Sequence, residues 1–119
     1  MTAAFVKLLV TDSARSVAFY EALGFERVSA EPPFVHLRWA EVLDVYLVTP
    51  PPQLKMEGRR GTGVLIGIRA EAPHSVDEVL LRAQAQGAAV DGPTVQPWFT
   101  RELIVTDPDG YRLNFIEPT

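Results

Sequence analysis

The 119-residue sequence contains no cysteine, and it contains no apolar run of the roughly 18 residues that a membrane-spanning helix needs. The absence of cysteine excludes disulfides, thiolate metal ligands and a thiol nucleophile. The N-terminus also lacks the basic and then apolar segment of a secretory signal. We therefore expect a cytoplasmic protein with no membrane partner. Its hydrophobic content of 47% is enough for one continuous core, which predicts a single domain over residues 1–119.

Positive charge and catalytic motifs are scarce as well. The 11 Lys and Arg residues are outnumbered by 15 Asp and Glu residues, which gives a net charge of −4. This balance opposes binding to a polyanion, so no nucleic-acid partner is expected. A cationic or neutral small molecule fits the charge better. No Gly-rich phosphate loop and no local Ser, His and Asp motif mark a catalytic centre.

The first half of the chain has the pattern of a βαβββ unit. A β-branched apolar strand from Phe5 to Val10 leads into Asp12 and Ser13, either of which can cap a helix. The helix runs to residue 23, and Gly24 supplies its left-handed stop. Three further strands are predicted at residues 25–30, 34–39 and 43–48, separated by turn residues.

The second half repeats this order after a segment rich in Pro, Gly and charge at residues 50–62. A strand at residues 64–69 is followed by Ser75 and Glu78, which have the spacing of a capping box, and Gly87 ends the helix. Strands beginning at residues 94, 101 and 112 complete the unit, with the turn sequence DPDG before the last. The prediction is an α+β fold of two βαβββ modules, residues 4–49 and 63–119, whose curved mixed sheets surround a central groove.

Three stretches together resemble the glyoxalase/bleomycin-resistance/dioxygenase, or vicinal oxygen chelate, superfamily. They are LLVTDSARSVAFYEALGF at residues 8–25, the strand-to-helix step at residues 64–79, and RELIVTDPDGYRLNFIE at residues 101–117. The segment that begins QPWFT at Gln96 is similar to the end of bleomycin-resistance proteins, where Gly usually follows QPW. The resemblance implies the vicinal oxygen chelate fold and favours the bleomycin-resistance branch.

The resemblance also implies where metal ligands would stand, because metal-dependent members hold a divalent ion from the first, fourth, fifth and eighth strands. The matching positions are Phe5, Val64 and Asn114, while alternation on the fourth strand leaves either Asp44 or Tyr46 as the inward residue. A divalent ion needs about three or four His, Asp or Glu donors. We therefore expect no bound metal, no other cofactor and no catalytic residues.

A groove that has lost its metal ligands is lined by apolar and aromatic side chains, which suits a planar or amphipathic ligand. The resemblance implies a homodimer that binds a small molecule without metal, as in sequestration of a bleomycin-like antibiotic. The alternative is a divergent metal-dependent lyase, isomerase or dioxygenase of the same superfamily. The candidate ligand-binding residues are Phe5, His36, Trp39, Asp44, Tyr46, Trp98, Phe99, Arg101 and Asn114.

Overall fold

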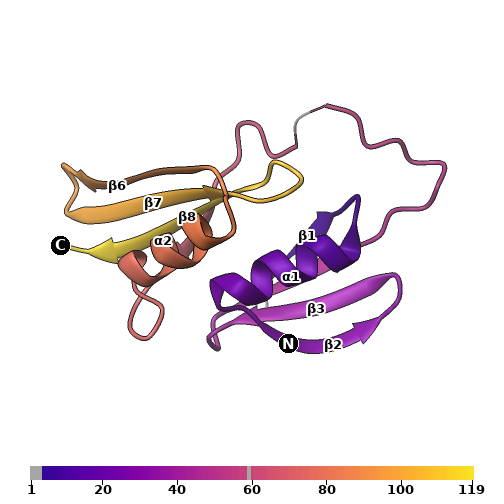
Figure 1. Ribbon diagram of the computed structural model, residues 1–119, viewed down its shortest axis with the longest axis horizontal. Helices are drawn as coiled ribbons and strands as arrows, with labels where there is room; N and C mark the ends of the chain where they lie inside the picture. Colours follow the sequence, from indigo (N-terminus) through magenta and orange to yellow (C-terminus); the bar gives the residue numbers. More distant parts are fainter. Residues whose placement is uncertain (1–3, 59) are drawn as a thin grey trace. The chain divides into compact units, whose positions relative to one another are not determined.

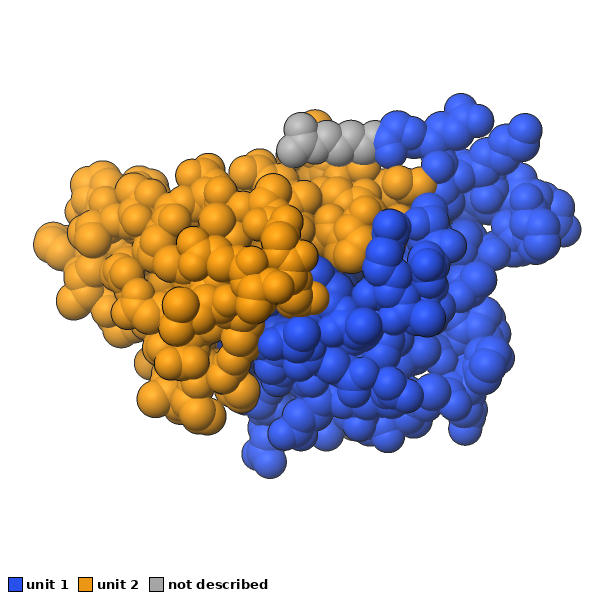
Figure 2. Space-filling view, in the orientation of Figure 1, with its two compact units in different colours: residues 1–58 blue, residues 59–119 orange. Residues whose placement is uncertain are grey.

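The computed structural model describes residues 4–58 and 60–119 of the chain. It divides into two compact units, residues 1–58 and 59–119 (Figures 1 and 2). The division falls inside the Pro- and Gly-rich segment at residues 50–62. Each unit has one helix and a four-stranded sheet in the order βαβββ, so the predicted α+β fold of two such modules is confirmed. No helix among the described residues is long and apolar enough to cross a bilayer.

The first unit is a mixed sheet with one helix. Its strand order is β1-β4-β3-β2, in which β1 runs parallel to β4 and the other pairs are antiparallel. The carboxylate of Asp12 accepts a hydrogen bond from the backbone N–H of Arg15 at 3.1 Å, which identifies Asp12 as the helix cap. The elements are β1 (Phe5–Leu9), α1 (Ser13–Leu23), β2 (Glu26–Glu31), β3 (Phe34–Trp39) and β4 (Leu43–Val48).

The core of the first unit lies between α1 and one face of its sheet. Leu37 of β3 is buried there with Val45 and Leu47 of β4, and each is at most 1% exposed. Tyr20 and Leu23 of α1 are fully buried, and α1 contacts β4. Because strand residues alternate between faces, burial of these odd-numbered residues places the even-numbered residues of β3 and β4 on the opposite face.

The second unit repeats this topology, with strand order β5-β8-β7-β6 and β5 parallel to β8. The Ser75 hydroxyl accepts a hydrogen bond from the backbone N–H of Glu78 at 3.2 Å, as the capping-box spacing predicts. Leu103, Val105 and Phe115 are fully buried on the face covered by the helix. The elements are β5 (Ile66–Arg69), α2 (Val76–Ala85), β6 (Val90–Gln96), β7 (Thr100–Thr106) and β8 (Arg112–Pro118).

Strand β6 differs from the sequence expectation, which placed a strand at residues 94–98. It begins at Val90 and continues through Gly92, where the pairing with β7 shifts register between Asp91 and Thr94. It ends at Gln96, because the following Pro97 has no N–H to donate and Phe99 has a φ of 66°. Trp98 therefore lies in the turn between β6 and β7.

Candidate functional site

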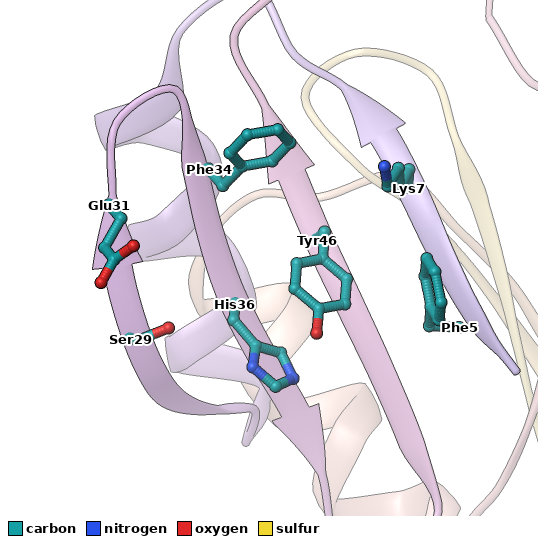
Figure 3. A pocket seen from close by; sticks show the side chains of 7 residues that line it. All are labelled: Phe5, Lys7, Ser29, Glu31, Phe34, His36 and Tyr46. Atoms are coloured by element: carbon teal, nitrogen blue, oxygen red, sulfur yellow. The ribbon is translucent and has the colours of Figure 1, made fainter. Parts of the chain in front are cut away.

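The strongest candidate site in the first unit is the face of its sheet that α1 leaves uncovered. Side chains from all four strands rise from this face toward a cavity of about 330 Å³ (Figure 3). Seven residues line the cavity. Three are aromatic, two carry opposite charges, and the other two are a serine and a histidine. We call this cavity the sheet pocket. It is lined by Phe5, Lys7, Ser29, Glu31, Phe34, His36 and Tyr46.

Strand pairing brings one polar side chain from each strand into a single row across the sheet pocket. Lys7 of β1 pairs with Tyr46 of β4, Tyr46 pairs with His36 of β3, and His36 pairs with Ser29 of β2. We call Lys7, Tyr46, His36 and Ser29 the polar row. Adjacent strands lie about 4.8 Å apart, so the row extends about 14 Å from its first strand to its last.

Aromatic contacts hold the middle of the polar row. The His36 and Tyr46 rings stack with centroids 4.4 Å apart and planes 12° apart. Phe5 meets Tyr46 edge to face, with ring centroids 5.3 Å apart. These contacts restrict the rotation of each ring and present a preformed apolar surface, which suits a flat ligand.

A buried carboxylate fixes the position of His36. Asp44 is fully buried, and its Oδ1 atom lies 2.7 Å from His36 Nε2 and accepts a hydrogen bond from Arg38 Nε at 2.9 Å. The neighbouring guanidinium favours the ionised form of Asp44, and an ionised carboxylate only accepts hydrogen bonds. His36 Nε2 is therefore the donor in this hydrogen bond.

The placement of Asp44 corrects the expectation that only one of Asp44 and Tyr46 faces inward. The two residues are two positions apart on β4, so both point to the same side of the sheet. Asp44 pairs with Arg38, whereas Tyr46 pairs with His36, and the structure gives them different roles. Asp44 is buried and pairs with Arg38 and His36, whereas Tyr46 lines the sheet pocket.

Trp39 does not lie on this face, which corrects its assignment as a ligand-binding residue. It is three positions from His36 on β3, so its side chain points to the opposite side of the sheet. Trp39 is 2% exposed and its ring centroid is 5.0 Å from that of Phe25. It is part of the core of the first unit.

Lys7 lines the sheet pocket but is not among the residues predicted from the sequence. Its Nζ atom lies 6.0 Å from the Phe5 ring centroid and 5.6 Å from that of Phe34. No ion pair within residues 4–58 and 60–119 includes Lys7. Alternation from Phe5 could have found Lys7. Ser29 and Glu31 could not be found that way, because the bulge between Arg27 and Ser29 resets the alternation on β2.

The other predicted residues lie in the second unit, where Glu102 is the centre of a separate cluster. Its carboxylate accepts hydrogen bonds from Trp98 Nε1 at 2.8 Å, from Asn114 Nδ2 at 3.1 Å and from the Thr100 hydroxyl. The Thr100 hydroxyl, followed by Trp98 and Asn114, lowers the pKa of Glu102, since each bond favours the ionised carboxylate. Asn114 and Trp98 are thus brought together by a residue outside the predicted set.

Arg101 is a further predicted residue that lies away from the sheet pocket. Its guanidinium binds Asp77 of α2 at 2.8 Å and Glu117 of β8 at 3.1 Å, and these two carboxylates raise the pKa of Arg101. Arg101 precedes Glu102 on β7, so its side chain points to the opposite, helix-covered face. It ties α2 to the sheet and does not join the Glu102 cluster. Phe99 lies in the β6–β7 turn and is 77% exposed.

The repeat of the two units shows which residues occupy equivalent positions. Val10 N–H bonds to Val48 O at 3.0 Å, and Ala70 N–H bonds to Ile116 O at 2.8 Å, so the two parallel strand pairs can be superposed residue by residue. The pair Lys7 and Tyr46 then corresponds to the pair Gly67 and Asn114. The fourth-strand counterpart of Asn114 is therefore Tyr46.

The same correspondence makes Leu65 the counterpart of Phe5 in the second unit. Phe5 lies two residues before Lys7, and Leu65 lies two residues before Gly67. Val64 is one residue out of phase and precedes β5. The metal-ligand positions implied by the sequence resemblance were Phe5, Val64, Asn114 and either Asp44 or Tyr46; the repeat puts Leu65 in place of Val64, and Asp44 is the one carboxylate among them. These residues do not fit a divalent ion. Within the described residues, no three His, Asp or Glu side chains form a metal-binding group.

Comparisons with known proteins identify relatives of the whole chain. Residues 2–115 match the model of the Glyoxalase/Bleomycin resistance protein/Dioxygenase superfamily. A glyoxalase/bleomycin resistance protein from Streptomyces sp. CB03234 is 26% identical, with a TM-score of 0.76 over 98% of this chain and 100% of that one. TnmS3, an antibiotic binding protein from the same organism, is 25% identical, with a TM-score of 0.73 over 100% and 98% of the two chains.

The structure of a bleomycin-binding protein complexed with bleomycin shares the fold. Its TM-score is 0.73 at 21% identity, and the match covers 100% of both chains. No curated protein matches this sequence significantly.

Proposed function

The chain belongs to the glyoxalase/bleomycin resistance protein/dioxygenase superfamily, and from this membership we propose that it binds a small molecule without transforming it. The observation that carries the proposal is the sheet pocket, in which Phe5, Phe34 and Tyr46 provide aromatic surface around polar groups. Its volume of about 330 Å³ lies at the lower end of the range for small-molecule sites. A pocket of this kind binds by stacking and by a small number of directed hydrogen bonds.

The residues at the family's metal positions favour binding over metal-dependent catalysis. Phe5 and Leu65 are hydrocarbon side chains, and Tyr46 and Asn114 are neutral. The one buried carboxylate nearby, Asp44, already accepts hydrogen bonds from Arg38 and His36. A lyase, isomerase or dioxygenase that polarises its substrate with a metal ion would have no adequate donor set on these strands.

The pocket surface favours a ligand with a planar aromatic group. The stacked His36 and Tyr46 rings offer a flat surface, and Phe5 and Phe34 border it on neighbouring strands. Offset stacking and edge-to-face contacts on such a surface add about 0.5–1.5 kcal/mol per ring pair beyond the area they bury. The Phe5, Tyr46 and His36 rings are already ordered by contact with one another, so little of their side-chain freedom is lost on binding.

Sequestration of an antibiotic is the specific form of binding that we propose, with bleomycin-like compounds as the first class to examine. The antibiotic-binding and bleomycin-resistance relatives support this choice. In this proposal the protein acts stoichiometrically as a homodimer in the cytoplasm, and it lowers the free concentration of its ligand.

The proposal is tested by thermal shift with bleomycin and a library of aromatic antibiotics, each with and without a chelator. A true ligand at about 100 times its dissociation constant should stabilise the folded protein by about 2.7 kcal/mol, equally with and without the chelator. Tyr46→Ala should lose most of this stabilisation because it removes the ring that both His36 and Phe5 contact. Leu81→Ala, at an exposed position on α2, is the matched control and should keep it.

The opposite results would point to the enzyme class. Stabilisation that appears only with a divalent metal, or conversion of the compound detected by mass spectrometry, would contradict metal-free binding. A library in which no compound stabilises the wild-type protein would remove the proposed function altogether.

A further inference from the structure

We propose that the ligand of the sheet pocket is an aromatic anion, a planar ring system bearing a carboxylate or an ionised phenol that binds to Lys7. This inference rests on the proposed function, because it names the class of molecule that the pocket takes. It is carried by the position of Lys7 between two aromatic side chains and by the absence of any carboxylate partner for it within residues 4–58 and 60–119.

The ammonium group of Lys7 is placed where a ring-bound anion would reach it. Its Nζ atom lies within about 6 Å of both the Phe5 and Phe34 ring centroids, and both rings line the same cavity (Figure 3). A ligand ring that contacts these side chains therefore brings its own substituents close to Lys7. A carboxylate there gains a charge-assisted hydrogen bond, which is about twice as strong as a neutral one.

The nearest buried carboxylate does not cancel this charge. Asp44 is part of the same face, but its Oδ1 atom already accepts from Arg38 Nε at 2.9 Å. The guanidinium and the carboxylate form an ion pair, so together they contribute little net charge to the pocket. Lys7 is left as the uncompensated charge at the β1 side of the polar row.

Glu31 lies at the opposite side of the pocket. It belongs to β2, at the far edge of the sheet order β1-β4-β3-β2. Three strand spacings of about 4.8 Å put the β1 and β2 backbones about 14 Å apart. Within residues 4–58 and 60–119, Glu31 forms no ion pair with Lys7, so it does not occupy the ammonium group that would meet the anion.

The rest of the polar row suits the remainder of such a ligand. Tyr46 and Ser29 carry hydroxyls that can donate or accept hydrogen bonds, and His36 has a second ring nitrogen, Nδ1, besides the one bonded to Asp44. An aromatic acid lying along the row would place its anion at Lys7 and its ring over the stacked Tyr46 and His36 side chains. Hydroxyl or amino substituents at its far end would meet Ser29.

The charge of Lys7 is opposite in sign to the net charge of the whole chain. A net charge of −4 attracts cations from a distance, but this long-range attraction is weakened by salt. The contact at Lys7 is short-ranged and involves an exposed ammonium group, so it too weakens as salt is added. Among the aromatic compounds considered above, the pocket therefore favours acidic members over neutral ones of the same shape.

The test uses three naphthalene derivatives that differ mainly in charge, measured with the full chain by isothermal titration calorimetry. They are 2-naphthoate as the anion, 2-naphthamide as the neutral analogue and 2-naphthylmethylammonium as the cation. We expect 2-naphthoate to bind about tenfold more tightly than the amide at low salt. We expect the cation to bind more weakly than the amide, and the preference for the anion to fall as salt is added.

Variants of the two lysines assign the preference to Lys7. Lys7→Met keeps an alkyl side chain without the charge, so it should reduce binding of 2-naphthoate to within about threefold of 2-naphthamide. Lys7→Arg should retain the preference. Lys55 is the other lysine of the chain and lies outside the pocket, so Lys55→Met is the matched control and should behave like the wild type. Thermal unfolding of each variant confirms that it is folded.

Two different results would overturn the inference in distinguishable ways. If the three compounds bind within a factor of about three of one another, or if the cation binds most tightly, the charge preference is wrong while small-molecule binding stands. If Lys7→Met keeps the full preference, another group recognises the anion and the assignment to Lys7 is wrong. If none of the three compounds binds and no library compound stabilises the protein, the proposed function fails together with this inference.

Discussion

Glu102 shows how single hydrogen bonds set the chemistry of a side chain in this protein. The three donors around it come from three places in the second unit, namely the β6–β7 turn, β7 itself and the neighbouring strand β8. All three favour the ionised carboxylate, so they lower the pKa of Glu102. The exposed indole of Trp98 is fixed to the sheet by this carboxylate.

Acid should therefore weaken the second unit through Glu102. Because the folded pKa is below the unfolded value of about 4.3, the stabilisation is fully present above that pH and is lost as pH falls through the folded pKa. The stability difference between the wild type and Glu102→Gln, measured by urea unfolding, should shrink between about pH 5 and pH 3.

Trp98→Phe provides the control for that prediction, since it removes one donor and leaves the carboxylate in place. It should move the pKa of Glu102 upward, toward its usual range, in a carboxyl NMR titration. A titration midpoint identical to that of the wild type would show that the bond from the indole to the carboxylate has no influence in solution.

Asp44 is a buried carboxylate whose role follows from its two partners, Arg38 and His36. A fully buried carboxylate is costly unless it is paired, and Arg38 and His36 provide that pairing at 2.9 and 2.7 Å. The result is an imidazole held in one orientation at the floor of the sheet pocket.

At the scale of elements, strand β6 depends on one glycine. The pairing of β6 with β7 shifts register between Asp91 and Thr94, and Gly92 at this bulge has a φ of 101°. A Cβ atom added at Gly92 would lie 2.7 Å from the backbone oxygen of Glu102 on β7. The bulge therefore brings the two backbones closer than any other residue would permit.

Substitution of Gly92 should lower the free energy of unfolding more than substitution of Gly63, which also has a positive φ but has no neighbouring atoms that a Cβ would meet. Gly63 has a φ of 87°, and a Cβ atom added there would have nothing within 4 Å. Gly63→Ala should therefore lower the free energy of unfolding by about 1 kcal/mol, from backbone strain alone. Gly92→Ala should cost about 1–3 kcal/mol more, because the strands must move apart. Urea unfolding of both variants measures the difference, and equal losses would mean that β6 shifts without cost.

At the scale of the whole molecule, we predict a homodimer. The turn between β6 and β7 carries Trp98 and Phe99, which are 61% and 77% exposed. Neighbouring exposed aromatics of this size are typical of an interaction surface. Light scattering after size-exclusion chromatography at tens of micromolar protein should give twice the chain mass of 13.1 kDa.

Phe99→Ser should lower the dimer fraction on dilution if this turn contributes to the contact. Leu81→Ser on α2 removes an exposed apolar side chain from a different element and should leave the dimer unchanged. A wild-type mass of 13.1 kDa at every concentration would contradict the dimer.

The sequence by itself determined the two βαβββ modules and their helix boundaries, because the signals for these features are local. Asp12, Ser75 and Gly24 act on backbone groups a few residues away, and the structure shows them in the predicted positions. Alternation within a single strand is equally local. It would have placed Asp44 with Tyr46, and it would have separated Trp39 from His36.

Only the tertiary structure decided which side chains from different strands meet. The polar row depends on the register of three strand pairs, and the bulges on β2 and β6 interrupt any count along the sequence. The packing of α2 against one face of β7 decided that Arg101, and not Glu102, lies on the helix-covered face. Register and face are set by long-range pairing and burial, so the net charge of −4 could not reveal that a lysine lies among the aromatic residues of the pocket.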